Sequence, residues 1–547
     1  MQLKQDQTDQ KLRGAYYTPE QLAKFIVDWS SREDGLGNSR ILEPSCGDGV
    51  FLSALSANAD EFNCVAVELD ENEAAKASIL VDNDSRFKVE NADFYRYYED
   101  NRTAQYDLIL GNPPYIRYQY LSLEQREEQS DILINSGLRP NKLINSWVSF
   151  TVAAVQQLSN CGKIGFVIPA ELLQVKYAEQ LRGYLMDQLN NITIVTFRNL
   201  IFSDVEQEVV VLLGEKIVNS EEHKIKILEF DDIEDLENNF FEENIKNPFL
   251  EMENNNRKWT RYFLSANQNQ LLSEILNSLT FRRFGEFAQV DVGITTGNNS
   301  FFCVDEDTAN QFDLVDVSRP LLARAVNIPS VVFNHQDWEL NVQNGAKTFL
   351  LDFNNQEPNE QQFEYIHLGE TAGDNTGYKT RIRNRWYEIP GIWVPDAFFL
   401  RRNNIFPKFV LNQMNAVSTD TMHRVRFINI PNDISRKKMI LSYYNSVAFA
   451  FTELEARSYG GGVLEILPRE LEAVTIPDLI NMDIDEQIVI ETFDEVDRLM
   501  RNNVEVERIL DLVDRVLEKE LELDRIQLTS LRQIWRTLMN RRIGRGN

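Results

Sequence analysis

The sequence contains little cysteine and little histidine. Its four cysteines, Cys46, Cys64, Cys161 and Cys303, form no CxxC pair, and none lies near a histidine at the spacing of metal ligands. A disulfide framework and a zinc site are therefore disfavoured. The four histidines are scattered along the chain, which argues against any metal site and against a histidine-based nucleophilic triad.

Long apolar runs are also missing. Nowhere do about 18 uncharged apolar residues follow one another, and residues 1–13 are polar and charged, without the apolar core of a signal peptide. These two absences predict a cytoplasmic protein. At 547 residues and 43% hydrophobic content, the chain is too long for one ordinary core, so two or three domains are expected.

Basic residues are outnumbered by acidic ones, 56 to 85, and the formal net charge of −29 is unfavourable for binding a nucleic acid. Its distribution matters more than its sum. Residues 377–426 carry nine basic and three acidic residues, a local charge of +6, and aromatic residues are interspersed among them. This composition is typical of phosphate contact and groove reading. The acidic stretches at residues 215–253 and 483–522 are interpreted as solvated faces that point away from a polyanion.

A small-residue turn follows the first expected strand. Residues 39–52 indicate a strand, a turn containing Gly47 and Gly49, and the start of a helix that continues through residue 57. Glycines allow a ligand to approach the backbone closely, and a helix amino terminus favours a carboxylate or phosphate. The turn lacks the third glycine of a dinucleotide fingerprint and the lysine of a P-loop, so NAD and ATP are disfavoured.

The next two expected strands end in acids. A strand at residues 64–70 brings Glu68 to about 20 residues after the glycines, where it is placed to take the hydroxyls of a ribose. The strand at residues 87–94 ends in Asp93 and Phe94, an acceptor for an adenine amino group and a ring to pack on it. These residues could instead be helix caps, surface acids or core. Their order favours one carboxyl edge of a parallel sheet.

The fourth strand, at residues 106–111, leads into Asn112, Pro113, Pro114 and Tyr115. The amide oxygen of Asn112 and the carbonyl of Pro113 can both accept from one NH2 group, since Pro114 has no N–H to donate. Tyr115 can stack on the ring that carries the amine. The alternative is an ordinary turn after a strand.

With these motifs, the chain resembles the class I S-adenosylmethionine-dependent methyltransferases. More narrowly, it resembles the gamma-class (TaqI-type) adenine-N6 DNA methyltransferases of restriction-modification systems, which place a Tyr-Thr-Pro motif, here residues 17–19, ahead of the cofactor turn. The resemblance covers residues 14 to about 215 well and the remainder loosely. It implies a Rossmann-like α/β catalytic domain at residues 1–245, a mixed α/β target-recognition domain at 246–484 and a helical segment at 485–547.

The resemblance also implies S-adenosylmethionine as cofactor and double-stranded DNA as partner. The methionine end would lie against the residues around the glycine turn, the ribose on Glu68, and the adenine on Asp93 and Phe94. The implied cofactor-binding set is Tyr17, Thr18, Glu43, Ser45, Cys46, Gly47, Gly49, Glu68, Leu69, Asp93, Phe94 and Asn112. The implied catalytic set is Asn112, Pro113, Pro114, Tyr115 and Phe202, with Phe202 stacking on the far face of the base unless it is a core residue.

Beyond residue 248 the regular alternation of strands and helices ends. The run Asn254–Asn256 is interpreted as a linker. Residues 292–299 form a glycine-punctuated turn, either a hairpin turn or the Gly-x-x-Thr-Gly segment that often opens the second domain of the family. Residues 485–539 show helical spacing and either pack on the recognition domain or pair with another subunit.

The resulting hypothesis is a bacterial, site-specific DNA adenine-N6 methyltransferase that acts on a flipped-out base. Two alternatives remain open: a methyltransferase for protein glutamine or rRNA that uses the same loop, and a non-catalytic DNA-specificity module. Chains of the first kind are typically short and lack a large second domain. A separate cognate restriction endonuclease as partner, and a monomer or a dimer, also remain open.

Overall fold

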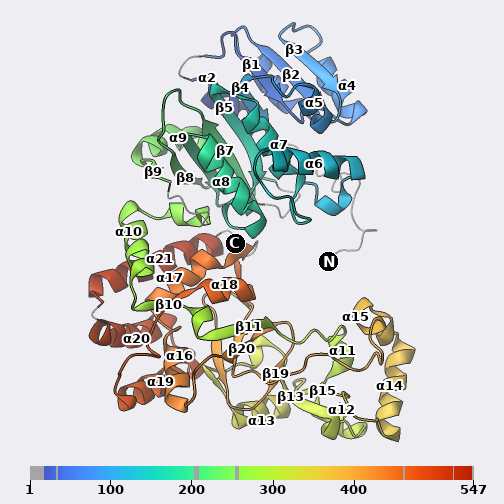
Figure 1. The fold of residues 1–547 in the computed structure, drawn as a ribbon, viewed down its shortest axis with the longest axis vertical. Helices are drawn as coiled ribbons and strands as arrows, with labels where there is room; N and C mark the ends of the chain where they lie inside the picture. The colour runs from blue at the N-terminus through green and yellow to red at the C-terminus, as the bar shows by residue number, and fades with distance from the viewer. Residues whose placement is uncertain are drawn as a thin grey trace. The chain divides into compact units, whose positions relative to one another are not determined.

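The computed structural model describes residues 18–32, 35–202, 208–252, 258–459, 462–521 and 523–544. The chain divides into two compact units, Met1–Ala266 and Asn267–Asn547 (Figure 1). Tyr17 and the asparagine run at 254–256 lie outside the described residues. Residues 485–547 fall within the second unit, and the division into three domains stays a prediction. In the part of the chain described here, no helix has the length and apolarity needed to cross a membrane.

The first unit is built on a nine-stranded sheet of order β3-β2-β1-β4-β5-β7-β6-β8-β9. The five neighbouring strands β3, β2, β1, β4 and β5 are parallel to one another, whereas β7 is antiparallel to both of its neighbours, β5 and β6. The order reverses between β1 and β4, which is where open α/β sheets bind ligands. The strands are β1 (Arg40–Glu43), β2 (Asn63–Glu68), β3 (Phe87–Asn91), β4 (Tyr106–Gly111), β5 (Leu158–Pro169), β6 (Asn191–Phe197), β7 (Val209–Glu215), β8 (Lys224–Phe230) and β9 (Leu250–Glu251).

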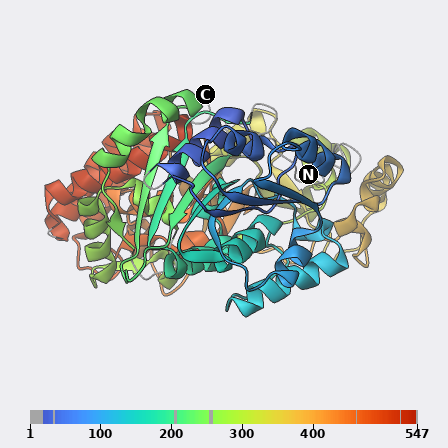
Figure 2. The same cartoon turned by 90° about the horizontal axis from the view of Figure 1, so that it is seen from above.

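Helices cover both faces of this sheet (Figure 2). They are α2 (Glu20–Ser31), α3 (Val50–Ser56), α4 (Glu71–Leu80), α5 (Phe94–Asp100), α6 (Leu123–Asn135), α7 (Ser146–Gln156), α8 (Glu179–Gln188) and α9 (Ile233–Lys246). Because strand side chains alternate between faces, Leu108 and Leu110 join one core with residues of α2, α3 and α9. Ile109 joins the other with residues of α7 and α8. The predicted class I α/β fold and its first four strands are confirmed.

Residues 215–253 are more structured than the sequence indicated. They contain β8, which pairs in parallel with β6, and α9, whose Leu236 and Phe240 are buried in the core. The acidic side chains do occupy the outward positions. Because they are so numerous, the apolar positions between them were not recognised in the sequence as part of a core. The sheet therefore extends beyond β7 to β6, β8 and β9.

The second unit is mixed α/β, as predicted. Its largest sheet has the order β11-β20-β16-β18-β14, and smaller sheets join β12-β15-β13-β19, β17-β22-β21 and β10-β23. The strands are β10 (Phe281–Arg283), β11 (Ala288–Val292), β12 (Cys303–Val304), β13 (Ser318–Leu322), β14 (Val332–Phe333), β15 (Phe349–Leu351), β16 (Ala397–Leu400), β17 (Arg402–Asn403), β18 (Phe409–Asn412), β19 (Val417–Ser418), β20 (Met422–Phe427), β21 (Arg457–Tyr459), β22 (Val463–Glu465) and β23 (Thr475–Pro477).

The glycine-punctuated segment after β11 is not a hairpin turn. It leads from β11, which pairs with β20, into a short helix, and Ile294 bridges Thr419 on the way. The helices of this unit are α10 (Ala266–Asn277), α11 (Asn299–Phe302), α12 (Glu306–Gln311), α13 (His335–Gln343), α14 (Glu360–Ala372), α15 (Tyr378–Arg381), α16 (Asp433–Leu441), α17 (Ser446–Glu455), α18 (Pro468–Ala473), α19 (Glu486–Arg501), α20 (Val506–Glu520) and α21 (Arg525–Gly544).

The last three helices confirm the predicted helical segment. They pack against α16 and α17 of the same unit. Arg542 of α21 and Glu453 of α17, both about 3% exposed, form an ion pair of 2.8 Å, and Asp514 of α20 accepts from the backbone N–H of Ser446 at 2.9 Å. Within this chain, the segment is therefore part of the second unit's core.

Candidate active site

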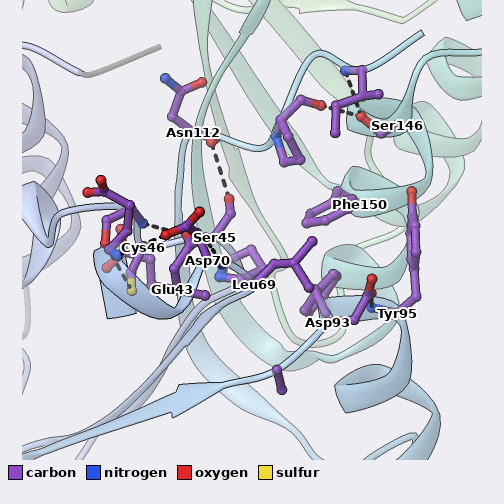
Figure 3. A pocket seen from close by; sticks show the side chains of 18 of the residues that line it. Glu43, Ser45, Cys46, Leu69, Asp70, Asp93, Tyr95, Asn112, Ser146 and Phe150 are labelled. Atoms are coloured by element: carbon purple, nitrogen blue, oxygen red, sulfur yellow. Dashed lines mark hydrogen bonds between the residues drawn. The ribbon is translucent and has the colours of Figure 1, made fainter. Parts of the chain in front are cut away.

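A cavity of about 690 Å3 opens at the carboxyl ends of β1, β2 and β4, beside the amino terminus of α5. This is the point at which the strand order of the first unit reverses. Figure 3 shows the side chains around it, with Asn112 at one end and Asp93 at the other. Cavities of this size suit a ligand the size of a nucleoside derivative.

The glycine turn after β1 borders the cavity with its backbone. Gly47 has a φ of +54°, and a Cβ added there would meet nothing within 4 Å, so the turn leaves open space for a ligand. Gly49 has a φ of +92° and precedes α3, but a Cβ there would lie 3.3 Å from the Cα of Ala77. Gly49 therefore allows close helix packing and does not line the cavity.

Glu68 connects this turn to the end of β2. Its Oε2 accepts from the N–H of Gly47 at 2.9 Å, and its Oε1 accepts from the N–H of Asp70 at 2.8 Å. Burial raises the pKa of Glu68, while these backbone hydrogen bonds act in the opposite direction. A carboxylate oxygen has more than one acceptor site, so both oxygens of Glu68 can still take a hydroxyl.

Glu43, the last residue of β1, is the most deeply buried acid of the cavity, at 1% exposure. Among the described residues, its Oε2 has no hydrogen-bond partner. Burial raises the pKa of Glu43 well above its usual value, and the charges of Glu68 and Asp48 raise it further. A carboxyl in this position is stabilised as the anion only when a cation lies beside it. The cavity is therefore suited to a positively charged ligand.

Asn112 is tied to the same turn and to the start of the described chain. Its Nδ2 donates to Thr18 Oγ1 at 3.2 Å, which fixes the orientation of the amide, and its backbone carbonyl accepts from Ser45 Oγ at 3.2 Å. Figure 3 shows the latter bond, between the glycine turn and the loop after β4. The two motifs that the sequence separates by more than 60 residues therefore meet in one site.

The other end of the cavity is formed by Asp93 and Phe94. Asp93 Oδ1 accepts from the N–H of Tyr95 at 2.8 Å and caps α5, while its Oδ2 accepts from Gln125 Nε2 at 2.8 Å. The ring of Phe94 packs on Phe150 with centroids 4.8 Å apart. Asp93 is thus a helix cap and a cavity residue at once, so the two interpretations of the sequence are compatible.

Most of the predicted site residues line this one cavity: Thr18, Glu43, Ser45, Cys46, Gly47, Glu68, Leu69, Asp93, Phe94, Asn112 and Pro114. Gly49, Pro113, Tyr115 and Phe202 are not among its lining residues. Tyr115 donates its hydroxyl to the carbonyl of Val167 at 3.0 Å, and Phe202, 7% exposed, is part of the core beneath α2 and α3. That burial fits a core phenylalanine, and the role of Phe202 at a target base stays a prediction.

Among the cavity residues that sequence reasoning missed are Gln125, Ser146 and Phe150, from the helices α6 and α7. Gln125 lies in the first turn of α6 and was hidden among polar residues. Ser146 and Phe150 lie on α7, in which residues 146–155 are all buried. A helix that is buried all round shows no contrast between an apolar and a charged face, so the side facing the cavity could not be identified.

Comparison with known sequences matches both units. Residues 3–275 match the family described as N-6 DNA Methylase, and residues 256–517 match the family described as Type II methyltransferase M.Eco57I, C-terminal domain. The two matches together span both units of the fold.

Individual relatives agree with these families. The chain is 25% identical over 495 residues to the type II methyltransferase M.AccI of Acinetobacter calcoaceticus, covering 86% of each protein. It is 21% identical over 478 residues to M.XamI of Xanthomonas campestris pv. amaranthicola, again with 86% of each covered. M.HincII of Haemophilus influenzae is 29% identical over 199 residues, 36% of each protein.

Proposed function

The chain belongs to the N6-adenine DNA methyltransferases, and from this premise we propose that it transfers a methyl group from S-adenosylmethionine to N6 of an adenine rotated out of duplex DNA. The observation that carries the proposal is the hydrogen bond between Ser45 and the backbone of Asn112. It brings an amine-holding loop to the edge of an acidic, nucleoside-sized cavity.

The residues of the cavity fit S-adenosylmethionine. Glu43, with its buried Oε2, would hold the ammonium of the methionine end, and Thr18 and the 45–47 turn would border it. Glu68 would accept from the ribose hydroxyls, and Asp93 with Phe94 and Phe150 would hold the adenine. When bound, the molecule supplies an electrophilic methyl group on a sulfonium.

The loop after β4 would activate the target amine. An aromatic amine is a poor nucleophile because its lone pair is delocalised into the ring. Hydrogen bonds from the amine to the Asn112 side chain and the Pro113 carbonyl strengthen as the nitrogen becomes pyramidal, so they stabilise the transition state more than the ground state. The bond from Asn112 to Thr18 keeps the amide in one orientation for this purpose. No strong general base is required.

An adenine within a duplex cannot reach this loop, so the target must be flipped at a cost of roughly a few kcal/mol. Tyr115 and Phe202 are the proposed stacking residues. The order of the motifs, with the cofactor turn before the catalytic loop and the recognition unit last, supports the gamma class. Because the relatives named above are type II methyltransferases, we also propose a separate restriction endonuclease as the partner and the bacterial cytoplasm as the location.

The second unit would supply the DNA-binding face. Apart from Lys408, which donates to the carbonyl of Ile328 at 3.3 Å, the basic residues of its stretch at 377–426 separate into two sets. Arg385 pairs with Glu357 at 2.6 Å, and Arg401 and Arg402 pair with Glu465 at 2.9 and 3.1 Å. Among the described residues, no carboxylate lies within ion-pair distance of a second set, the unpaired set: Lys379, Arg381, Arg383, Arg424 and Arg426. The unpaired set keeps its charge for an external anion.

Members of the unpaired set converge on one segment, residues 292–297. Arg383 donates to the carbonyls of Thr295 and Thr296 at 3.2 and 2.7 Å, and Arg424 donates to that of Val292 at 3.1 Å. The guanidinium groups of Arg424 and Arg426 lie 4.6 and 4.4 Å from the ring centre of Trp393. Arginines held over an aromatic ring and beside a turn suit contact with the DNA backbone.

The test is transfer of labelled methyl from S-adenosylmethionine to duplex DNA, followed by digestion and identification of N6-methyladenine. Asn112→Ala is expected to lower the rate of labelling by at least about a hundredfold and to retain cofactor binding. Labelling of protein or rRNA, but not of duplex DNA, would contradict the proposal. Methylation-sensitive long-read sequencing of DNA from an expressing host would then identify the target sequence.

A further inference from the structure

A buried serine holds the exit of the catalytic loop. Ser146, the first residue of α7, is 1% exposed and borders the cavity. Its Oγ donates to the carbonyl of Pro114 and accepts from the N–H of Ile116 at 3.0 Å. Its own backbone N–H donates to the carbonyl of Ile116 at 2.9 Å. Three hydrogen bonds therefore fix both residues that flank Tyr115.

These bonds also act on Pro113. Proline fixes its own φ at about −65°, so holding the carbonyl of Pro114 restrains the plane of the peptide that precedes it. The oxygen of that peptide belongs to Pro113, one of the two acceptors proposed for the target amine. The ring of Tyr115 is held independently at its tip, because its hydroxyl donates to Val167.

The same helix reaches the opposite end of the cavity. One turn after Ser146, Phe150 packs on Phe94, and Ser149 Oγ lies 2.8 Å from the hydroxyl of Tyr95. Phe94 and Tyr95 form the first turn of α5, directly after Asp93. The first turns of α7 therefore contact both the loop that would hold the acceptor amine and the helix that would hold the adenine of the methyl donor.

We propose that Ser146 is a positioning residue for methyl transfer: it acts through the Pro114–Ile116 backbone to keep the Pro113 carbonyl and the Tyr115 ring at a fixed place relative to the cofactor. This inference rests on the proposed function. It requires Ser146 to affect the chemical step and not the affinity for S-adenosylmethionine, because the residue contacts the loop and none of the acids of the cavity.

The experiment compares Ser146→Ala with Ser149→Ala. Both changes remove one hydroxyl from a buried serine in the first turn of α7, but only the first hydroxyl bonds the catalytic loop. Single-turnover methyl transfer to unmethylated plasmid DNA, the Kd for S-adenosylmethionine and the melting temperature are measured for each. Ser146→Cys, which keeps a weak donor of similar size, serves as the conservative variant.

The expected result for Ser146→Ala is a single-turnover rate about ten- to a hundredfold lower, since small displacements of reacting groups have effects of that size. Its Kd for the cofactor should stay within twofold of wild type, and Ser146→Cys should have an intermediate rate. Equal rates for Ser146→Ala and Ser149→Ala, or a loss of rate matched by a loss of cofactor affinity, would overturn the inference. Failure of the wild-type protein to methylate DNA would instead contradict the proposed function.

Discussion

The cavity of the first unit and the unpaired set of the second unit handle charge in opposite ways. In the cavity, Glu43, Asp48 and Glu68 lie close together, with Glu43 buried, Glu68 half-buried and Asp48 exposed, and partial or full desolvation raises the pKa of each. In the second unit, the unpaired cations lie near the surface, beside carbonyls and an aromatic ring. The ionised acids of the cavity destabilise the protein unless a cation binds beside them. The cations of the unpaired set stay charged without a ligand.

This difference explains why the net charge of −29 misleads about the partner. Most of the acids have no role at either site, and the sign of a binding surface depends on which charges lack an internal partner. At moderate ionic strength, salt screens the interaction between exposed charges more than about 10 Å apart. An anion beside a few unpaired arginines is therefore attracted to them more strongly than it is repelled by the many carboxylates farther away.

The largest effect is expected from a residue that belongs neither to the acids of the cavity nor to the unpaired set. Asn112→Ala should lower methyl transfer by about a hundredfold to a thousandfold, because it removes one acceptor that strengthens in the transition state. DNA affinity and cofactor affinity should be nearly unchanged in equilibrium binding measurements. A variant that loses cofactor binding as well would show that Asn112 is chiefly structural.

Replacing the buried acid tests the cavity side. Glu43→Gln should weaken cofactor binding roughly ten- to a hundredfold, the usual value of a charged hydrogen bond of about 1.5–3 kcal/mol. Calorimetry of the variant against wild type measures this. Glu61→Gln, a change at an exposed acid, is the matched control. Equal affinities for Glu43→Gln and wild type would exclude a cation at Glu43.

The pH dependence of the free energy of unfolding also tests whether the Glu43 carboxyl is destabilising when no cation is bound. The folded-state pKa of Glu43 is raised, so its contribution to stability is present below the unfolded value near 4.5 and is lost as the pH rises through the folded value. The ligand-free protein should therefore gain stability from Glu43→Gln at neutral pH, and the gain should shrink toward pH 4.5. Thermal melting across this range, with and without S-adenosylmethionine, measures both effects. A loss of stability at neutral pH would contradict the assignment.

The arginine side is tested by salt dependence. Arg381→Gln or Arg426→Gln should reduce the slope of log affinity against log salt by about 0.9 for each lost phosphate contact. Arg385→Gln, at an arginine that pairs with both Glu357 and Glu388, should leave the slope unchanged. Binding titrations on a fixed duplex at several salt concentrations measure the slopes. Identical slopes for the three variants would remove the distinction between paired and unpaired arginines.

The smallest effect is expected at the tip of Tyr115. Tyr115→Phe keeps the ring and loses only the hydrogen bond to Val167, worth about 0.5–1.5 kcal/mol. Methyl transfer should fall only a few-fold, whereas Tyr115→Ala should lose most activity. A parallel loss in both variants, in steady-state assays, would mean that the ring does not stack on the target.

The local motifs were predictable because they lie at strand ends. Glu43, Glu68 and Asn112 each follow a short apolar strand, and parallel strands bring their carboxyl ends to one edge, so sequence order alone placed them together. Ser146 and Phe150 could not be placed, since every residue of that helix region is buried. The paired and unpaired arginines could not be separated either, because the carboxylate that pairs with Arg402 belongs to Glu465, 63 residues away in the sequence.

The carboxylates of the second unit also bear on how a target sequence evolves. Glu465 holds two arginines, and Glu357 holds Arg385, away from any external anion. A substitution at either acid would leave a guanidinium without its carboxylate while every residue of the unpaired set stayed the same. Under the proposed function, target preference would then drift through acids outside the unpaired set, and sequence comparisons restricted to that set would overlook the cause.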